Sequence, residues 1–363
     1  MPKRIIIAGG GTGGHIFPAV AVANALRKID PGVDILFIGA KGKMEMEKVP
    51  QAGYEIVGLN IAGFNRSNLL KNLALPFKLM SSFFRVWQLL RQFKPQAVFG
   101  VGGYSSYPVL RMAQVMGIAT FLHESNAFAG KSNILLGKKA TAVFVAHTGM
   151  DKFFPAAKIR VTGNPVRAQI AKDDLNKQDA LAYFNLQQAR PVLFVMGGSL
   201  GAKSINEAIA GSLQHLVNQG LQIIWQTGKP FSQMAAQVAA GLPQVWVADF
   251  IKEMQYAYAA ADIVVSRAGA MSVAELCIAG KPVIFVPYPF AAEDHQTANA
   301  MALVQNQAAM LVKDEEVKVK LAGAIVELTN NEELRKQMMV NIKAMAVTHA
   351  DEEIANQIWK HIE

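Results

Sequence analysis

Apolar residues along this chain form short unbroken runs, and longer stretches with helical periodicity separate them. The runs are rich in Ile, Val and Phe and do not alternate with polar residues, which is typical of parallel strands covered on both faces. In the first half they predict strands at 4–8, 34–38, 55–58, 97–100, 118–122, 142–145 and 159–161. In the second half they predict strands at 192–196, 222–226, 245–247, 262–265, 283–286 and 309–311.

The stretches between these runs predict helices, so that strand and helix alternate along the whole chain. The first half has candidate helices at 14–29, 42–51, 68–93, 106–116 and 129–137. The second half has them at 201–218, 230–240, 252–260, 270–278, 294–306, 315–328, 331–346 and 350–362. Alternation of this kind predicts an α/β protein with two doubly wound parallel sheets.

The chain is expected to divide into two domains. Its 363 residues are too many for one ordinary core. A predicted strand ends in Gly163-Asn164-Pro165-Val166-Arg167, and the balance of charge changes sign there. We therefore expect an N-terminal domain over 1–164 and a C-terminal domain over 165–346, with the last helix, about 347–363, packing back on the first domain.

Composition indicates a globular protein of a reducing compartment. The chain is 52% apolar and 17% charged, and its single cysteine, Cys277, excludes an internal disulfide. No stretch reaches the roughly 18 apolar residues of a membrane span. The first residues lack the apolar region of a signal peptide.

Positive charge is concentrated in the first half. Residues 1–165 contain 20 Lys and Arg against 7 Asp and Glu, whereas the remainder contains 16 against 20. No acidic residue occurs from Ile56 to His123, where basic residues are interspersed with aromatic and aliphatic ones. Such a segment suits an anionic membrane surface. The residues assigned to that surface are Lys71, Leu75, Phe77, Lys78, Phe83, Phe84, Arg85 and Trp87.

This basic segment has two other interpretations. One is a buried helix with a solvated basic face. The other is a nucleic-acid partner, which is not expected because the chain carries no helix-turn-helix, zinc-finger or RNA-binding signature.

A glycine-rich turn follows the first predicted strand. Gly9 to Gly14 fits G-x-G-x-x-G between a strand and a helix, where backbone N–H groups and the helix start attract a phosphate. A dinucleotide site would also have an acidic residue after the next strand, but Ile35–Ile38 runs into Gly39-Ala40-Lys41. The turn therefore predicts phosphate binding rather than a nicotinamide dehydrogenase, with a plain tight turn as the alternative.

His15 stands directly after this turn, at the start of the predicted helix. The positive end of a helix disfavours the imidazolium form, so the ring stays neutral and able to accept a proton. We predict that His15 is a general base close to bound phosphate, and a purely structural histidine is the alternative.

Two more strands of the first half end in candidate chemistry. One leads into Gly100-Val101-Gly102-Gly103-Tyr104, and another ends in His123-Glu124-Ser125-Asn126. Open α/β sheets bind ligands at the carboxyl ends of their strands. We expect both segments to face the same ligand, although a tight strand-to-helix turn equally explains the first.

The second half repeats the strand, glycine turn and helix. Gly197-Gly198-Ser199-Leu200-Gly201 also matches the nucleophile-elbow pattern G-x-S-x-G of hydrolases. Phosphate binding is favoured, because the first turn repeats the glycines without a serine. No P-loop is present, and no spacing of His, Cys, Asp and Glu predicts a metal site.

A longer group of candidate residues follows the strand at 262–265. Ser266-Arg267-Ala268-Gly269 leads into a helix that carries Glu275, and Gln296 follows the next strand. A glycine turn at a helix start can hold a diphosphate, and a carboxylate within the helix can accept both hydroxyls of a ribose. Gln296 can bind sugar hydroxyls as donor and acceptor. The alternative for Glu275 is a solvated helix face.

Several motifs occur together and in order from about residue 4 to residue 345. They are Gly-Gly-Thr-Gly-Gly-His, Gly-Gly-Tyr, His-Glu-x-Asn, Gly-Asn-Pro-Val-Arg, Gly-Gly-Ser-x-Gly-Ala and Arg-x-Gly-Ala-x-x-x-x-Glu. In this order they resemble the MurG family of bacterial N-acetylglucosaminyltransferases, a part of glycosyltransferase family 28. The resemblance implies a GT-B fold, with two Rossmann-like doubly wound domains facing a cleft.

The resemblance also implies the binding residues. UDP-N-acetylglucosamine (UDP-GlcNAc) would contact Thr12, Gly13, Gly14, Asn126, Arg167, Ser199, Phe250, Ile251, Met254, Arg267, Gly269, Ala270, Met271, Ser272, Glu275 and Gln296. The acceptor diphosphate would lie on Gly11, Thr12, Gly13, Gly103, Tyr104 and Ser105. Where the family has two adjacent glutamines this chain has His295-Gln296, so Gln296 is assigned to the sugar.

The implied reaction is an inverting transfer of N-acetylglucosamine (GlcNAc) to the 4-hydroxyl of undecaprenyl-diphospho-N-acetylmuramoyl-pentapeptide, lipid I, giving lipid II. His15 is the predicted base and Glu124 the second candidate. Helix starts rather than an obligatory metal would stabilise the leaving UDP, and no cofactor is required, although a divalent cation can assist.

The resemblance places the protein at the cytoplasmic face of the bacterial inner membrane, as a peripheral protein that works with other cell-wall and division proteins. Two alternatives remain. One is a UDP-GlcNAc 2-epimerase or another lipid-directed glycosyltransferase of the same fold. The other is a non-catalytic sensor of a nucleotide sugar.

Overall fold

The computed structural model describes residues 2–61, 75–167, 170, 175–198, 200–291 and 294–363, and for residues 75–77 the backbone alone. The chain divides into two compact units. Met1–Arg167 and His349–Glu363 form the N-terminal unit, and Ala168–Thr348 forms the C-terminal unit. The end of the chain therefore belongs to the unit in which the chain begins.

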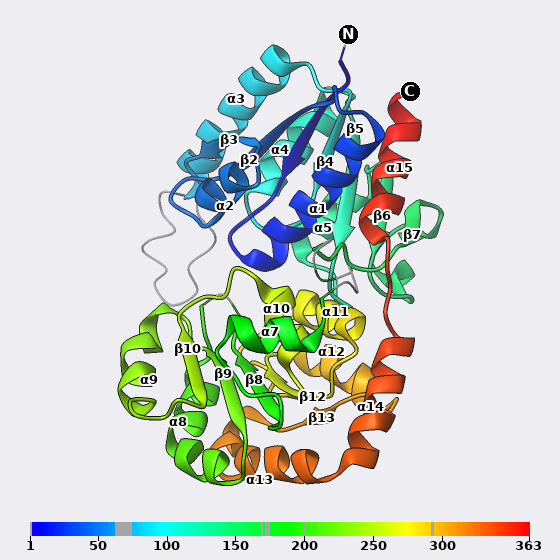
Figure 1. Cartoon of the computed structure of the whole chain (residues 1–363). Coiled ribbons are helices and arrows are strands. Elements are labelled where there is room, and N and C mark those ends of the chain that lie inside the picture. Colours follow the sequence, from blue (N-terminus) through cyan, green and yellow to red (C-terminus); the bar gives the residue numbers. More distant parts are fainter. Residues whose placement is uncertain (1, 62–74, 168–169, 171–174, 199, 292–293) are drawn as a thin grey trace. The chain divides into compact units, whose positions relative to one another are not determined.

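In the described residues, a seven-stranded parallel sheet runs through the N-terminal unit in the order β3-β2-β1-β4-β5-β6-β7 (Figure 1). The strands are β1 (Arg4–Ala8), β2 (Asp34–Ala40), β3 (Glu55–Leu59), β4 (Ala97–Gly100), β5 (Ala119–Glu124), β6 (Ala142–Val145) and β7 (Ile159–Val161). The helices are α1 (Gly13–Ile29), α2 (Glu45–Gln51), α3 (Leu75–Phe93), α4 (Ser106–Val115), α5 (Lys131–Gly137) and α15 (Ala350–Ile362). Strand order reverses between β1 and β4, which is where such sheets bind ligands.

The described part of the C-terminal unit has a six-stranded parallel sheet in the order β10-β9-β8-β11-β12-β13. The strands are β8 (Val192–Met196), β9 (Gln222–Gln226), β10 (Val245–Ala248), β11 (Ile263–Ser266), β12 (Val283–Phe285) and β13 (Met310–Leu311). The helices are α7 (Lys177–Tyr183), α8 (Lys203–Asn218), α9 (Ser232–Val238), α10 (Met254–Ala260), α11 (Ala270–Ala279), α12 (His295–Val304), α13 (Val317–Asn330) and α14 (Glu332–Ala344). The reversal falls between β8 and β11, as it does between β1 and β4.

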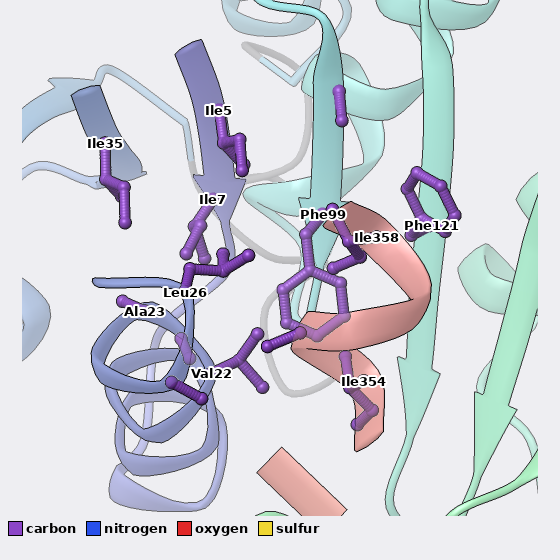
Figure 2. Close-up of a cluster of buried hydrophobic side chains, with 14 of the residues drawn as sticks. Ile5, Ile7, Val22, Ala23, Leu26, Ile35, Phe99, Phe121, Ile354 and Ile358 are labelled. Atoms are coloured by element: carbon purple, nitrogen blue, oxygen red, sulfur yellow. The ribbon is translucent and has the colours of Figure 1, made fainter. Parts of the chain in front are cut away.

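Figure 2 shows how the last helix is bound to the N-terminal unit. Ile354, Ile358 and Ile362 recur at helical spacing on α15, and all three side chains are buried. They share one core cluster with Ile5 and Phe99 of the sheet, and α15 packs against α1. Burial of each large aliphatic side chain contributes about 1.5–3 kcal/mol, which fixes the helix in place.

The predicted strands are all present, each within two residues of its predicted ends. Helix α7 is not predicted by the sequence pattern, because it has only 7 residues and begins within the polar stretch 172–179. Its start is fixed by Asn176, whose side chain accepts a hydrogen bond from the backbone N–H of Asp179 at 2.8 Å. The helix predicted at 68–93 is observed as α3 from Leu75 onward, and residues 68–74 lie outside the described residues.

Candidate functional site

Three adjacent strands bring the predicted chemistry of the N-terminal unit together. β1, β4 and β5 are neighbours in a parallel sheet, so their carboxyl ends meet at one edge. The turn at 9–14, the turn at 101–105 and the carboxylate of Glu124 follow these three ends.

Glycines allow the two turns to touch through their backbones. A Cβ at Gly103 would lie 2.6 Å from the carbonyl oxygen of Gly10, and Gly103 has a φ of +83°. A Cβ at Gly9 would lie 2.3 Å from Cγ2 of Val101. Part of the glycine pattern therefore reflects packing inside the protein, at a φ that side chains rarely adopt.

His15 lies at the start of α1, where the helix dipole is positive. Its Nδ1 is 3.3 Å from Oγ1 of Thr12. Burial lowers the pKa of His15, and the nearby carboxylates of Glu124 and Glu45 oppose that shift without cancelling it. The ring is therefore neutral at pH 7 and can take up a proton.

Glu124 is buried, and both oxygens of its carboxylate are engaged. Oε1 accepts hydrogen bonds from the backbone N–H and from Nδ2 of Asn126, at 3.1 and 3.2 Å. Oε2 accepts from the backbone N–H of Gly130 at 3.0 Å and from Nδ2 of Asn133 at 2.8 Å. These four hydrogen bonds hold the carboxylate in place and fix the loop after β5. This arrangement favours His15 over Glu124 as the base.

His123 is fully buried and links β5 to the segment at 163–164. Its Nε2 is 3.1 Å from the carbonyl oxygen of Gly163, and its Nδ1 is 3.3 Å from Oγ of Ser125. Asn164 Nδ2 donates to the Ser125 carbonyl at 3.2 Å. Burial lowers the pKa of His123 to about 4. A neutral ring that donates from Nε2 and accepts at Nδ1 satisfies both contacts, so His123 has a structural role.

The other predicted residues of the N-terminal unit lie around these turns. Tyr104 is half-buried, and burial raises its pKa, with a smaller contribution from the negative charge of Glu45. The side chain of Ser105 is buried, whereas Thr12 is exposed. The guanidinium of Arg167 lies 4.4 Å above the centre of the Phe17 ring, on α1. Gly11, Gly13 and Gly14 offer only backbone atoms.

In the C-terminal unit, backbone contacts hold the turn after β8. The N–H of Gly201 donates to the carbonyl of Gly198 at 3.1 Å, and a Cβ at Gly201 would lie 2.0 Å from the Thr227 carbonyl oxygen. Ser199, one of the predicted UDP-GlcNAc contacts, lies outside the described residues. The structure thus describes the glycines on either side of Ser199 and the contacts that hold them.

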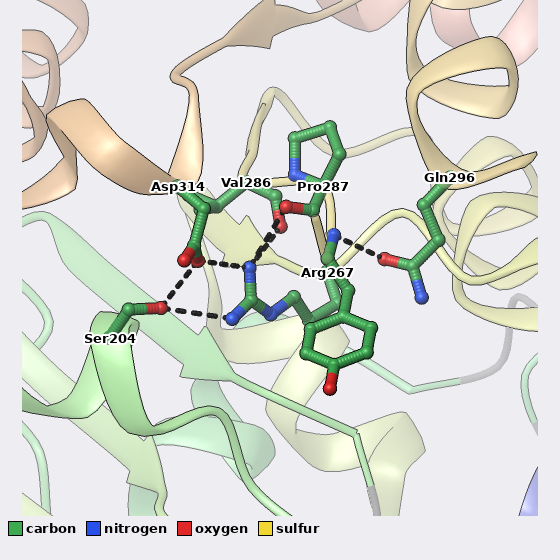
Figure 3. A network of polar contacts seen from close by, with 7 residues as sticks. Ser204, Arg267, Val286, Pro287, Gln296 and Asp314 are labelled. Atoms are coloured by element: carbon green, nitrogen blue, oxygen red, sulfur yellow. Dashed lines mark hydrogen bonds and ion pairs between the residues drawn. The ribbon is translucent and has the colours of Figure 1, made fainter. Parts of the chain in front are cut away.

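Arg267 is the centre of an internal network at the end of β11 (Figure 3). Its Nη1 donates to the carbonyl oxygens of Val286 and Pro287, both at 3.0 Å, and to Oδ1 of Asp314 at 2.6 Å. Its Nη2 donates to Oγ of Ser204 at 2.9 Å. A charge paired in this way fixes the ends of β11 and β12 against the start of α8. Contact of Arg267 with a donor stays a prediction.

Glu275 lies on α11 and is 6% exposed, so the alternative of a solvated helix face is wrong. Its Oε2 accepts a hydrogen bond from the hydroxyl of Tyr258 at 3.0 Å. Gly269 precedes the helix, and Ala270, Met271 and Ser272 form its first turn. The structure therefore holds a carboxylate in a fixed orientation within the helix that follows the glycine.

Three of the predicted donor contacts are apolar residues near the start of α10. Ile251 and Met254 are buried, and Phe250 is half-buried. Gln296 Oε1 accepts a hydrogen bond from the backbone N–H of Tyr288 at 2.9 Å (Figure 3), which fixes the amide beside the loop after β12.

The described part of α3 has one face in the core and one face exposed. Val86, Leu89 and Leu90 are buried. Phe84 is 60% exposed and Trp87 is 36% exposed. These two rings stack with their centroids 5.8 Å apart, and the guanidinium of Arg91 lies 5.0 Å from the Trp87 ring centroid.

Other residues assigned to the membrane surface differ in exposure. Arg85 is exposed, whereas Lys78 and Phe83 are half-buried. Lys71 and the side chains of Leu75 and Phe77 lie outside what the structure describes. The exposed face of α3 therefore presents aromatic and basic residues side by side.

Some residues of these sites carry no pattern in the sequence. Asp314 and Ser204 reach Arg267 from other elements, and Asn133 reaches Glu124 from α5. Glu45 contacts the first glycine turn from α2. Glu45 differs from the other three residues, because the sequence could have indicated it. A G-x-G-x-x-G turn is usually accompanied by an acidic residue near the end of the next strand, and Glu45 is the first acidic residue after β2.

Three further features bear on the chemistry available. Burial raises the pKa of the Cys277 thiol to about 12, so this thiol is not a nucleophile. The described residues contain no group of three or more His, Cys, Asp and Glu that could hold a metal ion. None of the described helices has the length and apolarity needed to cross a bilayer.

Two Rossmann-like units, each with a glycine turn where its strand order reverses, define the GT-B fold, which many glycosyltransferases share. Two family models match the chain: the Glycosyltransferase family 28 N-terminal domain over residues 5–145 and the C-terminal domain over residues 192–355. The chain belongs to glycosyltransferase family 28.

The chain is also similar to individual proteins of known name or structure. The UDP-N-acetylglucosamine–N-acetylmuramyl-(pentapeptide) pyrophosphoryl-undecaprenol N-acetylglucosamine transferase of Bacteroides fragilis is 48% identical over 98% of this chain and 95% of its own. The crystal structure of Acinetobacter baumannii MurG has a TM-score of 0.77 at 30% identity and covers 99% of this chain and 100% of that one. A UDP-N-acetylglucosamine 2-epimerase has a TM-score of 0.67 at 15% identity, covering 99% and 97%, and shares the fold alone.

Proposed function

We propose that this chain transfers GlcNAc from UDP-GlcNAc to the 4-hydroxyl of lipid I, with inversion at the anomeric carbon, to give lipid II for peptidoglycan synthesis. The observation that carries this conclusion is the 48% identity, across nearly the whole chain, to a transferase with this donor and acceptor in its name. Two phosphorylated substrates also account for a glycine turn in each unit.

The C-terminal unit binds the donor. The Glu275 carboxylate, oriented by Tyr258, accepts the ribose hydroxyls, and the N–H groups at the start of α11 face the diphosphate. Phe250, Ile251 and Met254 provide the apolar contact for uracil, and Gln296 binds the sugar. Arg267 holds the surrounding loops through its bonds to Asp314 and Ser204.

The N-terminal unit binds the acceptor and supplies the base. The turns at 11–13 and 103–105 bind the acceptor diphosphate through backbone N–H groups. His15 takes the proton of the 4-hydroxyl while the hydroxyl oxygen attacks the anomeric carbon. The bond from that carbon to UDP breaks, and UDP leaves with the electron pair. The lowered pKa of His15 supports this role, because only a neutral imidazole can accept the proton.

Negative charge grows on the leaving diphosphate during the transfer. The N–H groups of a helix start stabilise such charge without a metal ion. In this account a divalent cation can assist but is not obligatory.

The acceptor is anchored in a membrane by its lipid, so the enzyme has to work at that surface. We place it at the cytoplasmic face of the inner membrane as a peripheral protein, together with other cell-wall and division proteins. The exposed aromatic and basic residues of α3, Phe84, Trp87, Arg85 and Arg91, support this placement.

Transfer of labelled GlcNAc from UDP-GlcNAc to a short-chain lipid I analogue, with and without EDTA, tests the proposal. Labelled disaccharide product in both tubes is expected. Product only without EDTA would overturn the metal-independent account of the leaving group. Absence of product, with measurable UDP-GlcNAc binding, would contradict the transferase function and favour the epimerase or the sensor.

A further inference from the structure

A buried carboxylate that the proposed chemistry does not use lies beneath the glycine turn of the N-terminal unit. Glu45 is the first residue of α2 and is 1% exposed. Its Oε2 accepts a hydrogen bond from the backbone N–H of Gly11 at 2.8 Å, and its Oε1 accepts one from the backbone N–H of Ala40 at 2.9 Å. One carboxylate thus joins the turn after β1 to the end of β2.

Two glycines make room for this side chain. A Cβ at Gly10 would lie 2.3 Å from Cδ of Glu45, and a Cβ at Gly39 would lie 2.5 Å from its Cγ. Real Cβ contacts are not this short, so glycine at both positions is a condition for the carboxylate to fit. Gly10 belongs to the turn and Gly39 to β2, so both sides of the pocket are shaped around Glu45.

The hydrogen-bond partners of Glu45 differ from those of the acidic residue in nucleotide-binding sheets. In those sheets an acidic side chain at the end of the second strand binds the ribose of the ligand. Glu45 brings an acid to that place, but both of its oxygens bind backbone N–H groups of the protein itself. The acid therefore serves the turn rather than a nucleotide.

The carboxylate also places charge near the reacting groups. Three titratable groups interact electrostatically with His15: Glu45 from α2, and Glu124 and the neutral His123 from β5. The charge of Glu45 raises the pKa of His15 against the effect of burial, and it contributes to the raised pKa of Tyr104. Removal of this charge would therefore make the His15 ring less basic.

We propose that Glu45 is a positioning residue for the transfer reaction, which fixes the glycine turn against β2 and so holds the start of α1, with His15, in place. The inference rests on the proposed function, because His15 is the base of that reaction. Because both of its oxygens accept backbone hydrogen bonds, Glu45 is assigned no contact with a substrate.

The test compares Glu45→Gln with Glu47→Gln, which removes an exposed carboxylate from the same helix. Transfer to a short-chain lipid I analogue gives kcat across pH, and NMR of labelled histidine gives the pKa of His15. We expect Glu45→Gln to lower kcat about ten- to hundred-fold and to lower the pKa of His15. The acidic limb of its kcat profile then moves to lower pH. Glu47→Gln should change neither property.

Two checks keep the outcome clear. Binding of UDP should stay within about two-fold in each variant, which shows that the C-terminal unit is intact. If Glu45→Gln does not fold, Gly39→Ala displaces the carboxylate while every charge is kept, and it should also lower kcat. Wild-type kcat together with a wild-type pKa of His15 would overturn the role of Glu45. A wild-type protein that forms no product would overturn the function instead, and the NMR comparison would still decide the role of Glu45.

Discussion

Among single residues, His15 has the surroundings that a base at neutral pH requires. Burial and the start of α1 favour the neutral ring, while the carboxylates of Glu45 and Glu124 favour the protonated ring. The balance leaves a lowered pKa, so the ring is neutral at pH 7, and in the proposed reaction the two carboxylates would stabilise the proton that it accepts. This combination suits a proton acceptor that must later release the proton.

Replacement of His15 by alanine is expected to lower kcat about 10²- to 10⁴-fold, because the 4-hydroxyl then loses its proton acceptor. In the wild type, kcat should rise with pH through the pKa of His15, which lies below the usual histidine value, and the variant should lack this limb. Steady-state kinetics across pH measures both effects, with the exposed His215→Ala as control. If His15→Ala retained near-normal rates, another group would be the base.

Glu275→Gln is expected to weaken binding of UDP about ten-fold or more, because a charged acceptor for ribose hydroxyls becomes a neutral one. Isothermal titration calorimetry with UDP measures the dissociation constant. Glu327→Gln, an exposed change on α13, should leave it unchanged. Equal affinities of the two variants would place the ribose elsewhere.

The lowered pKa of His123 makes the free energy of unfolding depend on pH. Its pKa is about 4 in the folded protein, below the unfolded value of about 6.5, so the unfolded chain binds the proton first as pH falls. Its contribution is complete above pH 6.5 and is lost as pH falls toward 4, by about 2 kcal/mol between pH 7.5 and pH 5. Urea unfolding at these two pH values measures the loss, which His123→Gln should reduce. An equal loss in both proteins would show that His123 titrates normally.

The sequence could place residues near a strand end, but it could not place residues that arrive from elsewhere in the chain. His15 directly follows one glycine turn and Glu275 lies in the helix after another, so the sequence predicts the turn near which each of them lies. Asp314 meets Arg267 across 47 positions of sequence, and no local pattern encodes that contact. The solvated-face alternative for Glu275 failed because a helix covered on most sides buries the carboxylate, which Tyr258 then satisfies.

At the scale of elements, α3 combines a structural face with an exposed face. Val86, Leu89 and Leu90 anchor it in the core, so Phe84 and Trp87 are held at the surface by a fixed helix. The stacked rings and the guanidinium of Arg91 form a compact aromatic and cationic group. Such a group can enter the headgroup region of an anionic bilayer without a spanning helix.

The double change Phe84→Ser and Trp87→Ser is expected to weaken binding to vesicles with anionic lipid about ten- to hundred-fold, because the apolar area that enters the bilayer is lost. Vesicle sedimentation measures the partitioning. The rate with a water-soluble acceptor analogue should stay unchanged. As control, Val340→Ser alters an exposed apolar residue of α14 in the other unit. Undiminished vesicle binding by the double variant would mean that another surface docks.

Strands and helices could be predicted where a single pattern of apolar residues determines them. Continuous Ile, Val and Phe runs mark strands buried on both faces, and these predictions were correct for both sheets. Helix α7 was missed because it begins within the polar stretch 172–179 and its start depends on the cap at Asn176. Amphipathic periodicity carries little signal over so short a helix.

At the scale of the whole molecule, the two units have the same plan but different surroundings for their glycine turns. The turn of the N-terminal unit is held by the carboxylate of Glu45, and the described part of the turn after β8 is held by backbone contacts and by the amide of Gln226, which donates to the Gly198 carbonyl. A family 28 chain thus uses one supersecondary motif twice, and the residues behind each turn give each unit its own chemistry.

The most direct test of the account compares two acceptors: a short-chain lipid I analogue and the same molecule without its 4-hydroxyl. NMR of the purified product determines the linkage. We predict a β-1,4-linked disaccharide from the complete analogue, with release of one UDP per bond, and no product from the 4-deoxy compound. Transfer to the 4-deoxy compound, an α linkage, or conversion of UDP-GlcNAc without any acceptor would contradict the account.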